Sequence, residues 1–425
     1  MGIVGRKAGR RKSAGDCARK RMIGEQRGIN LDICMYFQVH QPMRLRKFSL
    51  FNESAGSLFD LYFDHDLNER ILRKVATKCY FPTNSLLLEL LDEYPDFRVG
   101  FSLTGVFMEQ CKRFMPEVLD SFKALADTGR VDFLAETYYH SLSSLFPKKD
   151  EFFEQLAMHK EALAGIHANP QVFRNTEAMF SNEIAWLAEG KGYKGIMTEG
   201  LESFLGWRSP NYLYSVKGCK KIRALLRNYK LSDDVGYRFS ARWWSEYPLT
   251  ADKYAAWLAS SPGEVVNIFM DYETFGEHQW ADTGIFQFMR SLPGEVLNYP
   301  HLHFKTPAEV AESVPPKGEI DVPNVISWAD MERDTSAWLG NDMQRACFTM
   351  LQELEQPLKE LQDPELLHIW RLLQNSDHLY YLSTKSLSDQ DVHNYFSPYD
   401  NPFEGFINFM NILQDFKGRV EAMKK

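Results

Sequence analysis

Seven short apolar runs, each ending at or near a polar residue, are the feature that most constrains the fold. They lie between residues 31 and 271 and are continuous rather than alternating, which is typical of strands buried on both faces of a sheet. Stretches with helical periodicity separate them, such as "TNSLLLELLDEYP" at 83–95. The polar residues at or near the ends of the runs are His40, Thr104, Glu136, Glu183, Glu199, Arg227 and Asp271.

Alternating strands and helices predict an α/β fold, because a parallel sheet needs a helical crossover between successive strands. Seven strands favour a closed or nearly closed barrel, here a distorted (β/α)7 barrel. In such barrels the C-terminal ends of the strands carry the chemistry. The polar residues that end the seven runs are therefore expected to surround one cleft.

The chain divides into three predicted parts. Residues 1–30 carry nine Lys/Arg against two Asp/Glu and lack periodicity, which predicts a basic, disordered N-terminal arm. Residues 31–312 are predicted to form the catalytic barrel. Beyond the Pro-rich stretch 313–324, three segments have apolar residues at three-to-four spacing. They predict a helical C-terminal domain, 313–425, that contributes to the cleft.

The net charge indicates which class of substrate the protein can bind, and the cysteine spacing indicates its redox environment. The net charge is −8 although the first 30 residues are basic, so the rest of the chain is strongly acidic. An acidic body disfavours nucleic acid and anionic membranes and suits a neutral substrate. The six cysteines show no CxxC spacing, which indicates reduced thiols in the cytoplasm. No apolar stretch reaches the length of a membrane span.

Two carboxylates near predicted strand ends suggest a reaction. Glu183 lies in "MFSNEIAW" and Asp271 opens "DYETFGEHQW". A carboxylate pair across a barrel mouth can hydrolyse a glycoside, one group attacking the sugar carbon and the other donating a proton. A single Glu is more often an ion-pair partner, so spacing alone leaves both roles open. Motifs for phosphoryl transfer, dinucleotide binding and serine hydrolysis are missing from the sequence.

Five segments in order resemble the conserved regions of glycoside hydrolase family 57, in its α-amylase-like branch. The segment "SWADMERDTSAWLGNDMQ", 327–344, is also similar to the stretch that follows the barrel in that family. The five segments are "FQVHQP" (37–42), "VDFLAETYYH" (131–140), "MFSNEIAW" (179–186), "FMDYETFGEHQW" (269–280) and "KTPAEV" (305–310).

The resemblance implies a retaining glycosidase that acts on α-1,4-glucans without a cofactor or metal. It implies Glu183 as nucleophile and Asp271 as general acid and base. Asp271 would then need a raised pKa, from burial and from a neighbouring negative charge. Phe275 is expected to anchor the loop after it, and Gly276 to permit a tight turn. The expected substrate-binding residues are His40, Gln41, His140, Trp207, His278, Trp328 and Asp330.

Several alternatives stay open at this point. A 4-α-glucanotransferase would use the same carboxylate pair, with a sugar hydroxyl in place of water. A weakly active or inactive glucan-binding protein is a further alternative. His40, His140, His278 and Asp271 could in principle form a metal site, although the chain has no H-x-D or H-x-x-x-H pair at a strand end. The oligomeric state is not indicated.

Overall fold

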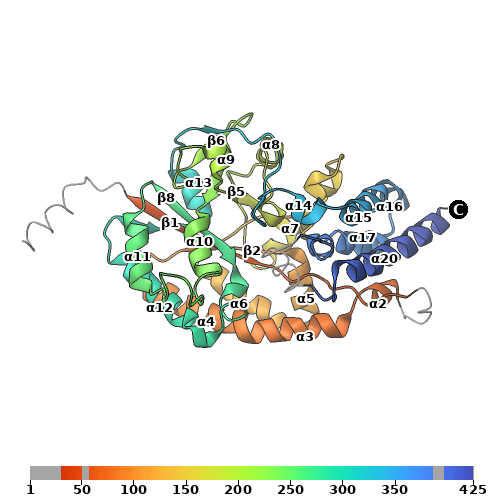
Figure 1. The fold of residues 1–425 in the computed structure, drawn as a ribbon, viewed down its shortest axis with the longest axis horizontal. Helices are drawn as coiled ribbons and strands as arrows, with labels where there is room; N and C mark the ends of the chain where they lie inside the picture. Colours follow the sequence, from red (N-terminus) through yellow and green to blue (C-terminus); the bar gives the residue numbers. More distant parts are fainter. Residues whose placement is uncertain (1–29, 50–56, 386–396, 425) are drawn as a thin grey trace, which may run out of the picture.

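The computed structural model describes residues 30–49, 57–385 and 397–424. The predicted N-terminal arm, apart from Asn30, lies outside the described residues. Figure 1 shows the sheet with its surrounding helices on one side of the molecule and the C-terminal helices gathered on the other.

Seven parallel strands of the described chain close into a barrel. Parallel pairing joins β1 to β2 and β8, β2 to β3, β4 to β5, β5 to β7, and β7 to β8. A parallel bridge between Ala135 and Phe173 joins the end of β3 to β4 and completes the ring. The strands are β1 (Leu31–Val39), β2 (Val99–Leu103), β3 (Val131–Phe133), β4 (Val172–Arg174), β5 (Gly195–Glu199), β7 (Arg223–Arg227) and β8 (Val265–Asp271). The predicted barrel is confirmed.

Three short strands extend the sheet. β9 (Leu302–Phe304) pairs with β1, β6 (Tyr214–Val216) runs antiparallel to β7, and β10 (Glu319–Ile320) pairs with β6. β10 follows residue 312, so a strand beyond the predicted barrel boundary still belongs to the sheet. The division into domains at that residue stays a prediction.

The fourth strand lies earlier in the chain than the apolar pattern predicts. The run "EAMFS", 177–181, was expected to be this strand, but Thr176–Ala178 is a 3-10 turn and the strand is Val172–Arg174. Glu177 and Ala178 have φ angles of 57° and 51°. These left-handed conformations cannot continue a strand. The charged Arg174 inside the true strand obscured its apolar character.

Helices occupy the connections between the strands. A π-helical turn, Ala76–Tyr80, joins α3 directly to α4. The helices of the barrel region are α2 (Leu58–Tyr62), α3 (His65–Val75), α4 (Phe81–Glu93), α5 (Gly105–Phe114), α6 (Pro116–Asp127), α7 (Asp150–Ala164), α8 (Asn182–Gly190), α9 (Glu202–Leu205), α10 (Tyr229–Gly236), α11 (Ala251–Ser260), α12 (Ile285–Leu297) and α13 (Pro307–Ser313). Those that follow are α14 (Ser336–Leu339), α15 (Asp342–Glu353), α16 (Glu355–Leu361), α17 (Pro364–Leu373), α18 (Ser376–Tyr380) and α20 (Pro402–Met423). No described helix has an apolar stretch long enough to cross a bilayer.

Helix α13 covers the end of the barrel where the strands begin. Its Val310 and Ala311 belong to the same buried cluster as Tyr36 inside the barrel. A side chain at Gly100 would meet Pro307 at 2.9 Å, and one at Gly195 would meet Ala311 at 3.1 Å. The predicted region "KTPAEV" therefore closes the barrel floor through a helix with a capping box.

One hydrophobic core joins the barrel loops to the C-terminal helices. Tyr62 and Phe63 at the end of α2 and Tyr138 after β3 share a buried cluster with Trp338 and Trp370. Because Trp338 and Trp370 are almost fully buried there, this core fixes the C-terminal helices against the loops that follow the barrel strands.

Candidate active site

Glu177, in the turn after β4, is the centre of a buried polar network. Its Oε1 lies 3.1 Å from His140 Nε2 and accepts a hydrogen bond of 3.0 Å from Ser376 Oγ. Its Oε2 accepts a hydrogen bond of 2.8 Å from Trp328 Nε1. The left-handed backbone of Glu177 is a strained conformation of the kind that concentrates at functional sites. Three distant parts of the chain thus hold one carboxylate in place.

His140 lies between two carboxylates. Its Nδ1 is 3.2 Å from Glu136 Oε2 and its Nε2 faces Glu177. Burial opposes a charge on the imidazole, but the two carboxylates outweigh burial and raise the pKa of His140 to about 9. Burial likewise opposes ionisation of Glu177, yet the hydrogen bond and charge of His140 lower the pKa of that carboxyl. Glu177 is therefore ionised at neutral pH.

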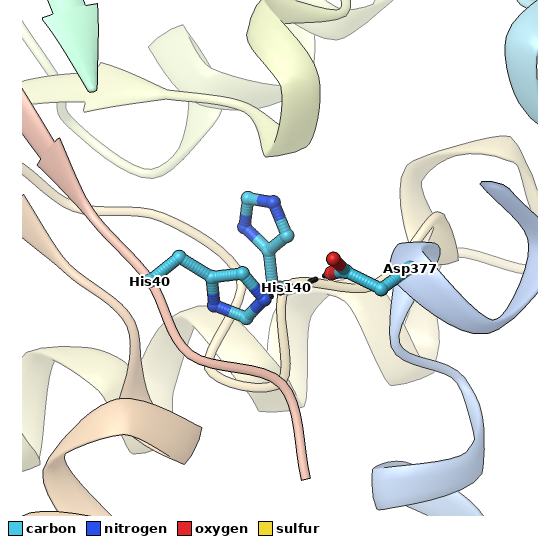
Figure 2. Close-up of side chains that lie close together, drawn as sticks. All are labelled: His40, His140 and Asp377. Carbon is cyan, nitrogen blue, oxygen red and sulfur yellow. Dashed lines mark hydrogen bonds and ion pairs between the residues drawn. The ribbon is translucent and has the colours of Figure 1, made fainter. Parts of the chain in front are cut away.

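His40, at the end of β1, stacks on His140. The ring centroids are 4.0 Å apart (Figure 2). His40 Nδ1 lies 2.9 Å from Thr104 Oγ1, and Nε2 lies 2.9 Å from Asp377 Oδ2 in α18. Burial and the charge of His140 lower the pKa of His40, although Asp377 acts in the opposite direction. One stacked ring is thus neutral and the other cationic.

The same three side chains could offer ligand atoms to a metal ion, a set that shares only His40 and His140 with the one predicted from the sequence. One ligand atom each from His40, His140 and Asp377 lie within 4.8 Å of one another. All four ring nitrogens already face hydrogen-bond partners, and His140, with its raised pKa, is protonated at neutral pH. A protonated imidazole has no lone pair for a metal. The donor set therefore fits a charged hydrogen-bond network better, and a metal-free reaction stays a prediction.

Asp271, at the end of β8, has the opposite environment to Glu177. Among residues 30–49, 57–385 and 397–424, no group donates a hydrogen bond to its carboxylate. Burial raises the pKa of Asp271 to about 6, with Arg174 acting against the shift and the negative charge of Glu177 adding to it. Two neighbouring carboxyls whose pKa values are pushed apart in this way can serve as nucleophile and proton donor.

Glu183 does not belong to this network. It lies in the first turn of α8, its side chain is 64% exposed, and its carboxylate pairs with Lys149 at 3.4 Å. The carboxylate that acts on Asp271 is Glu177. The pairing of Glu183 with Asp271 that the sequence predicted is therefore replaced in the structure by Glu177 with Asp271. The reason is the position of β4, which places Glu177 at the strand's C-terminal end.

The other predicted substrate-binding residues fall into two groups. His40, His140 and Trp328 belong to the network around Glu177. Gln41 directly follows His40 in the chain, and its side chain donates a hydrogen bond to the Tyr80 hydroxyl at 3.2 Å. That hydroxyl in turn donates to Glu273, whose pKa is raised to about 8 by burial and by Asp271.

Three predicted residues have surroundings of their own. Asp330 pairs with Lys385 at 2.8 Å. His278 lies near the Glu277–Lys74 ion pair, and burial lowers its pKa to about 4. Trp207 follows α9 and is 95% exposed. A role for these three in binding sugar stays a prediction.

Sequence reasoning missed Glu177, Arg174, Ser376 and Asp377, and did not assign Glu136 to the site. The signal for Glu136 was its place at the end of the third predicted strand. A signal for Ser376 and Asp377 was available in "NSD", 375–377, because three polar residues interrupt an otherwise apolar helical segment.

The chain is similar to known proteins over most of its length. The model of glycosyl hydrolase family 57 matches residues 34–323. A Methanocaldococcus jannaschii protein named "Putative alpha-amylase" is 52% identical over 402 residues, which cover 92% of this chain and 85% of that protein.

Two solved structures show the same fold. A branching enzyme of this family from Thermococcus kodakaraensis has a TM-score of 0.65 at 12% identity, covering 92% of this chain and 90% of that one. A 4-alpha-glucanotransferase from Thermococcus litoralis has a TM-score of 0.56 at 16% identity, covering 89% of this chain. This chain spans about half the length of that enzyme, 55%.

Proposed function

The chain belongs to glycoside hydrolase family 57, and we propose that it cleaves α-1,4-glucans with retention, using Glu177 as nucleophile and Asp271 as general acid and base. The observation that carries the proposal is the contrast between two buried carboxyls: His140, Ser376 and Trp328 hold the carboxylate of Glu177, whereas no group among the described residues donates to that of Asp271. The pKa values of the two carboxyls are shifted in opposite directions accordingly. Starch, glycogen and malto-oligosaccharides are the substrates that we expect.

The surroundings of Glu177 suit attack on the anomeric carbon. His140 and Ser376 hold one carboxylate oxygen and Trp328 holds the other, so the nucleophile is ionised and its direction is fixed. Asp271 keeps a proton to nearly neutral pH and donates it to the departing glucan oxygen. These two steps form the glycosyl-enzyme ester.

Asp271 becomes a base in the second half of the reaction. Once Glu177 is esterified its negative charge is gone, and that charge is one of the causes of the raised pKa of Asp271. The pKa of Asp271 then falls, and the ionised carboxylate removes a proton from the attacking water or sugar hydroxyl. One carboxyl thus serves both steps.

Two matched variants test the nucleophile. Glu177→Gln keeps the shape of the side chain but removes the attacking oxyanion, so we expect kcat on maltoheptaose to fall by several orders of magnitude. Glu183→Gln, six residues further on, should keep activity within about twofold, because that side chain is exposed and paired with Lys149. A normal rate for Glu177→Gln would contradict the proposal.

Water is the acceptor that we expect, as in an α-amylase, because the relative with 52% identity carries that name. A 4-α-glucanotransferase with the same pair is the alternative. Chromatography of the products from maltoheptaose separates them: only shorter oligomers mean hydrolysis, and longer ones mean transfer. Glycogen binding without release of reducing ends would favour a glucan-binding protein instead.

A cytoplasmic location is part of the proposal, supported by the free thiols of the described cysteines.

A further inference from the structure

Arg174, the last residue of β4, takes no part in the attack or the proton transfers proposed above. Its side chain is 1% exposed. Within the described part of the chain, neither its Nη1 nor its Nη2 has a hydrogen-bond partner. The nearest carboxylate, Glu136, is 3.9 Å away and too far for a hydrogen bond. Buried guanidinium groups are normally fully paired, so two free Nη groups in one side chain require an explanation.

Arg227 on the neighbouring part of the barrel provides a comparison inside the same site. The guanidinium groups of Arg174 and Arg227 both lie over the ring of Trp328, at 4.7 and 5.9 Å from its centroid. All three guanidinium nitrogens of Arg227 donate hydrogen bonds: Nε to Phe269 O at 2.7 Å, Nη1 to Glu199 at 3.0 Å and Nη2 to Asp233 at 2.5 Å. Arg174 also lies over Trp328, but its Nη1 and Nη2 have no hydrogen-bond partner among the described residues.

The unpaired Nη groups of Arg174 lie close to the two carboxyls of the proposed reaction. Trp328, on which Arg174 lies, donates to the Glu177 carboxylate, and Arg174 is three residues before Glu177 in the chain. The charge of Arg174 acts on both Glu177 and Asp271. A ligand that reaches the two carboxyls therefore comes within the range of this guanidinium.

We propose that Arg174 is a substrate-binding residue, whose Nη groups donate hydrogen bonds to hydroxyl oxygens of the sugar unit held between Glu177 and Asp271. The inference rests on the function proposed above. A neutral hydroxyl is the ligand that fits, because Glu136 lies 3.9 Å from the guanidinium, the charge of Arg174 also acts on Glu177, and these two carboxylates would repel an anion. Arg174 thereby selects a sugar that carries the matching hydroxyl at the cleaved position.

The test uses α-maltosyl fluoride and versions of it that each lack one hydroxyl of the sugar next to fluorine. For the parent enzyme we expect kcat/KM to fall roughly 10- to 100-fold when the hydroxyl bound by Arg174 is missing. Arg174→Lys keeps the charge but loses the fork of two donors. It should be slower on the complete substrate and should no longer distinguish it from that deoxy form.

The control is Arg223→Lys, at the start of β7. This variant should distinguish the complete substrate from the deoxy form as the parent enzyme does. An equal loss by Arg174→Lys on every substrate would show that Arg174 binds no particular hydroxyl of this sugar, and would overturn the inference. So would a parent enzyme that is indifferent to each hydroxyl, a result that needs no folded variant. A parent without activity on any α-glucan donor would instead overturn the proposed function, and this inference with it.

Discussion

At the scale of single residues, the site depends on how one carboxyl stays charged while its neighbour keeps a proton. His140 supplies the difference: caught between Glu136 and Glu177, it carries a proton and lowers the pKa of both carboxyls. Asp271 has no such donor among the described residues, so burial, with the charge of Glu177 adding to it, raises its pKa. Strain accompanies this arrangement, since His140 and Glu177 both have positive φ angles.

The pH dependence follows from these shifts. Because Asp271 must be protonated and its pKa is about 6, kcat/KM on maltoheptaose should fall above that pH, by about tenfold per unit. Since the pKa of Glu177 is lowered, the acidic limb should lie below the ordinary range of a glutamate.

α-Maltosyl fluoride is the control for this profile, measured as initial rates over pH 4–9. Fluoride departs without a proton from Asp271, so the decline above pH 6 should be absent for that substrate. The same decline with both substrates would assign it to another group, such as Glu273.

At the scale of elements, the loop after β8 is held by packing that the sequence predicted. Phe275 is buried against Phe37, with ring centroids 5.4 Å apart, and Gly276 has a φ of 108°. Both expectations are confirmed. Glu277 fixes the end of the loop through its ion pair with Lys74. The loop therefore positions Asp271 without bonding to its carboxylate.

Gly276→Ala should destabilise the protein. A Cβ at Gly276 would lie 2.0 Å from the carbonyl oxygen of Lys78, in a backbone conformation that side chains disfavour. We expect a loss of about 2–4 kcal/mol in the free energy of unfolding, measured with urea. Gly190→Ala at the end of α8, where nothing lies within 4 Å, should change it by less than about 1 kcal/mol. Equal effects would contradict the close approach at Gly276.

The start of α18 brings the C-terminal helices into the site. Ser376 donates to Glu177, its backbone N–H donates to His140 O at 2.9 Å, and Asp377 faces His40. The segment therefore completes the network that the barrel strands begin.

Asp377→Asn should lower activity while the fold persists. It removes the charge that orients His40 against His140, so kcat/KM on maltoheptaose should fall roughly 10- to 100-fold. Asp342→Asn in α15 is the control, because its carboxylate is exposed and pairs only with Arg345 among described groups. A fully active Asp377→Asn enzyme would show that the charge of Asp377 is not needed to hold His40 in place.

At the scale of the whole molecule, barrel and C-terminal helices are expected to unfold together. Their shared core joins Tyr62, Phe63 and Tyr138 to Trp338 and Trp370, so neither part can lose its structure without exposing the other. Calorimetry should show one cooperative transition, with activity lost in the same temperature range. Two separate transitions would mean that the parts fold independently.

The sequence by itself determined the barrel, the helical C-terminal region and the place of Asp271 at the end of a long strand. These depend on local patterns: continuous apolar runs, helical periodicity and a carboxylate directly after a long strand. Only the tertiary structure decided which glutamate faces Asp271, because β4 has three residues, contains a buried arginine and ends in a left-handed turn that no apolar pattern reveals. It also decided that Ser376 reaches Glu177 and that Asp377 reaches His40, across 199 and 337 residues of sequence. Contacts of that kind arise from packing between the barrel loops and the C-terminal helices, and they leave no periodic signal in the chain.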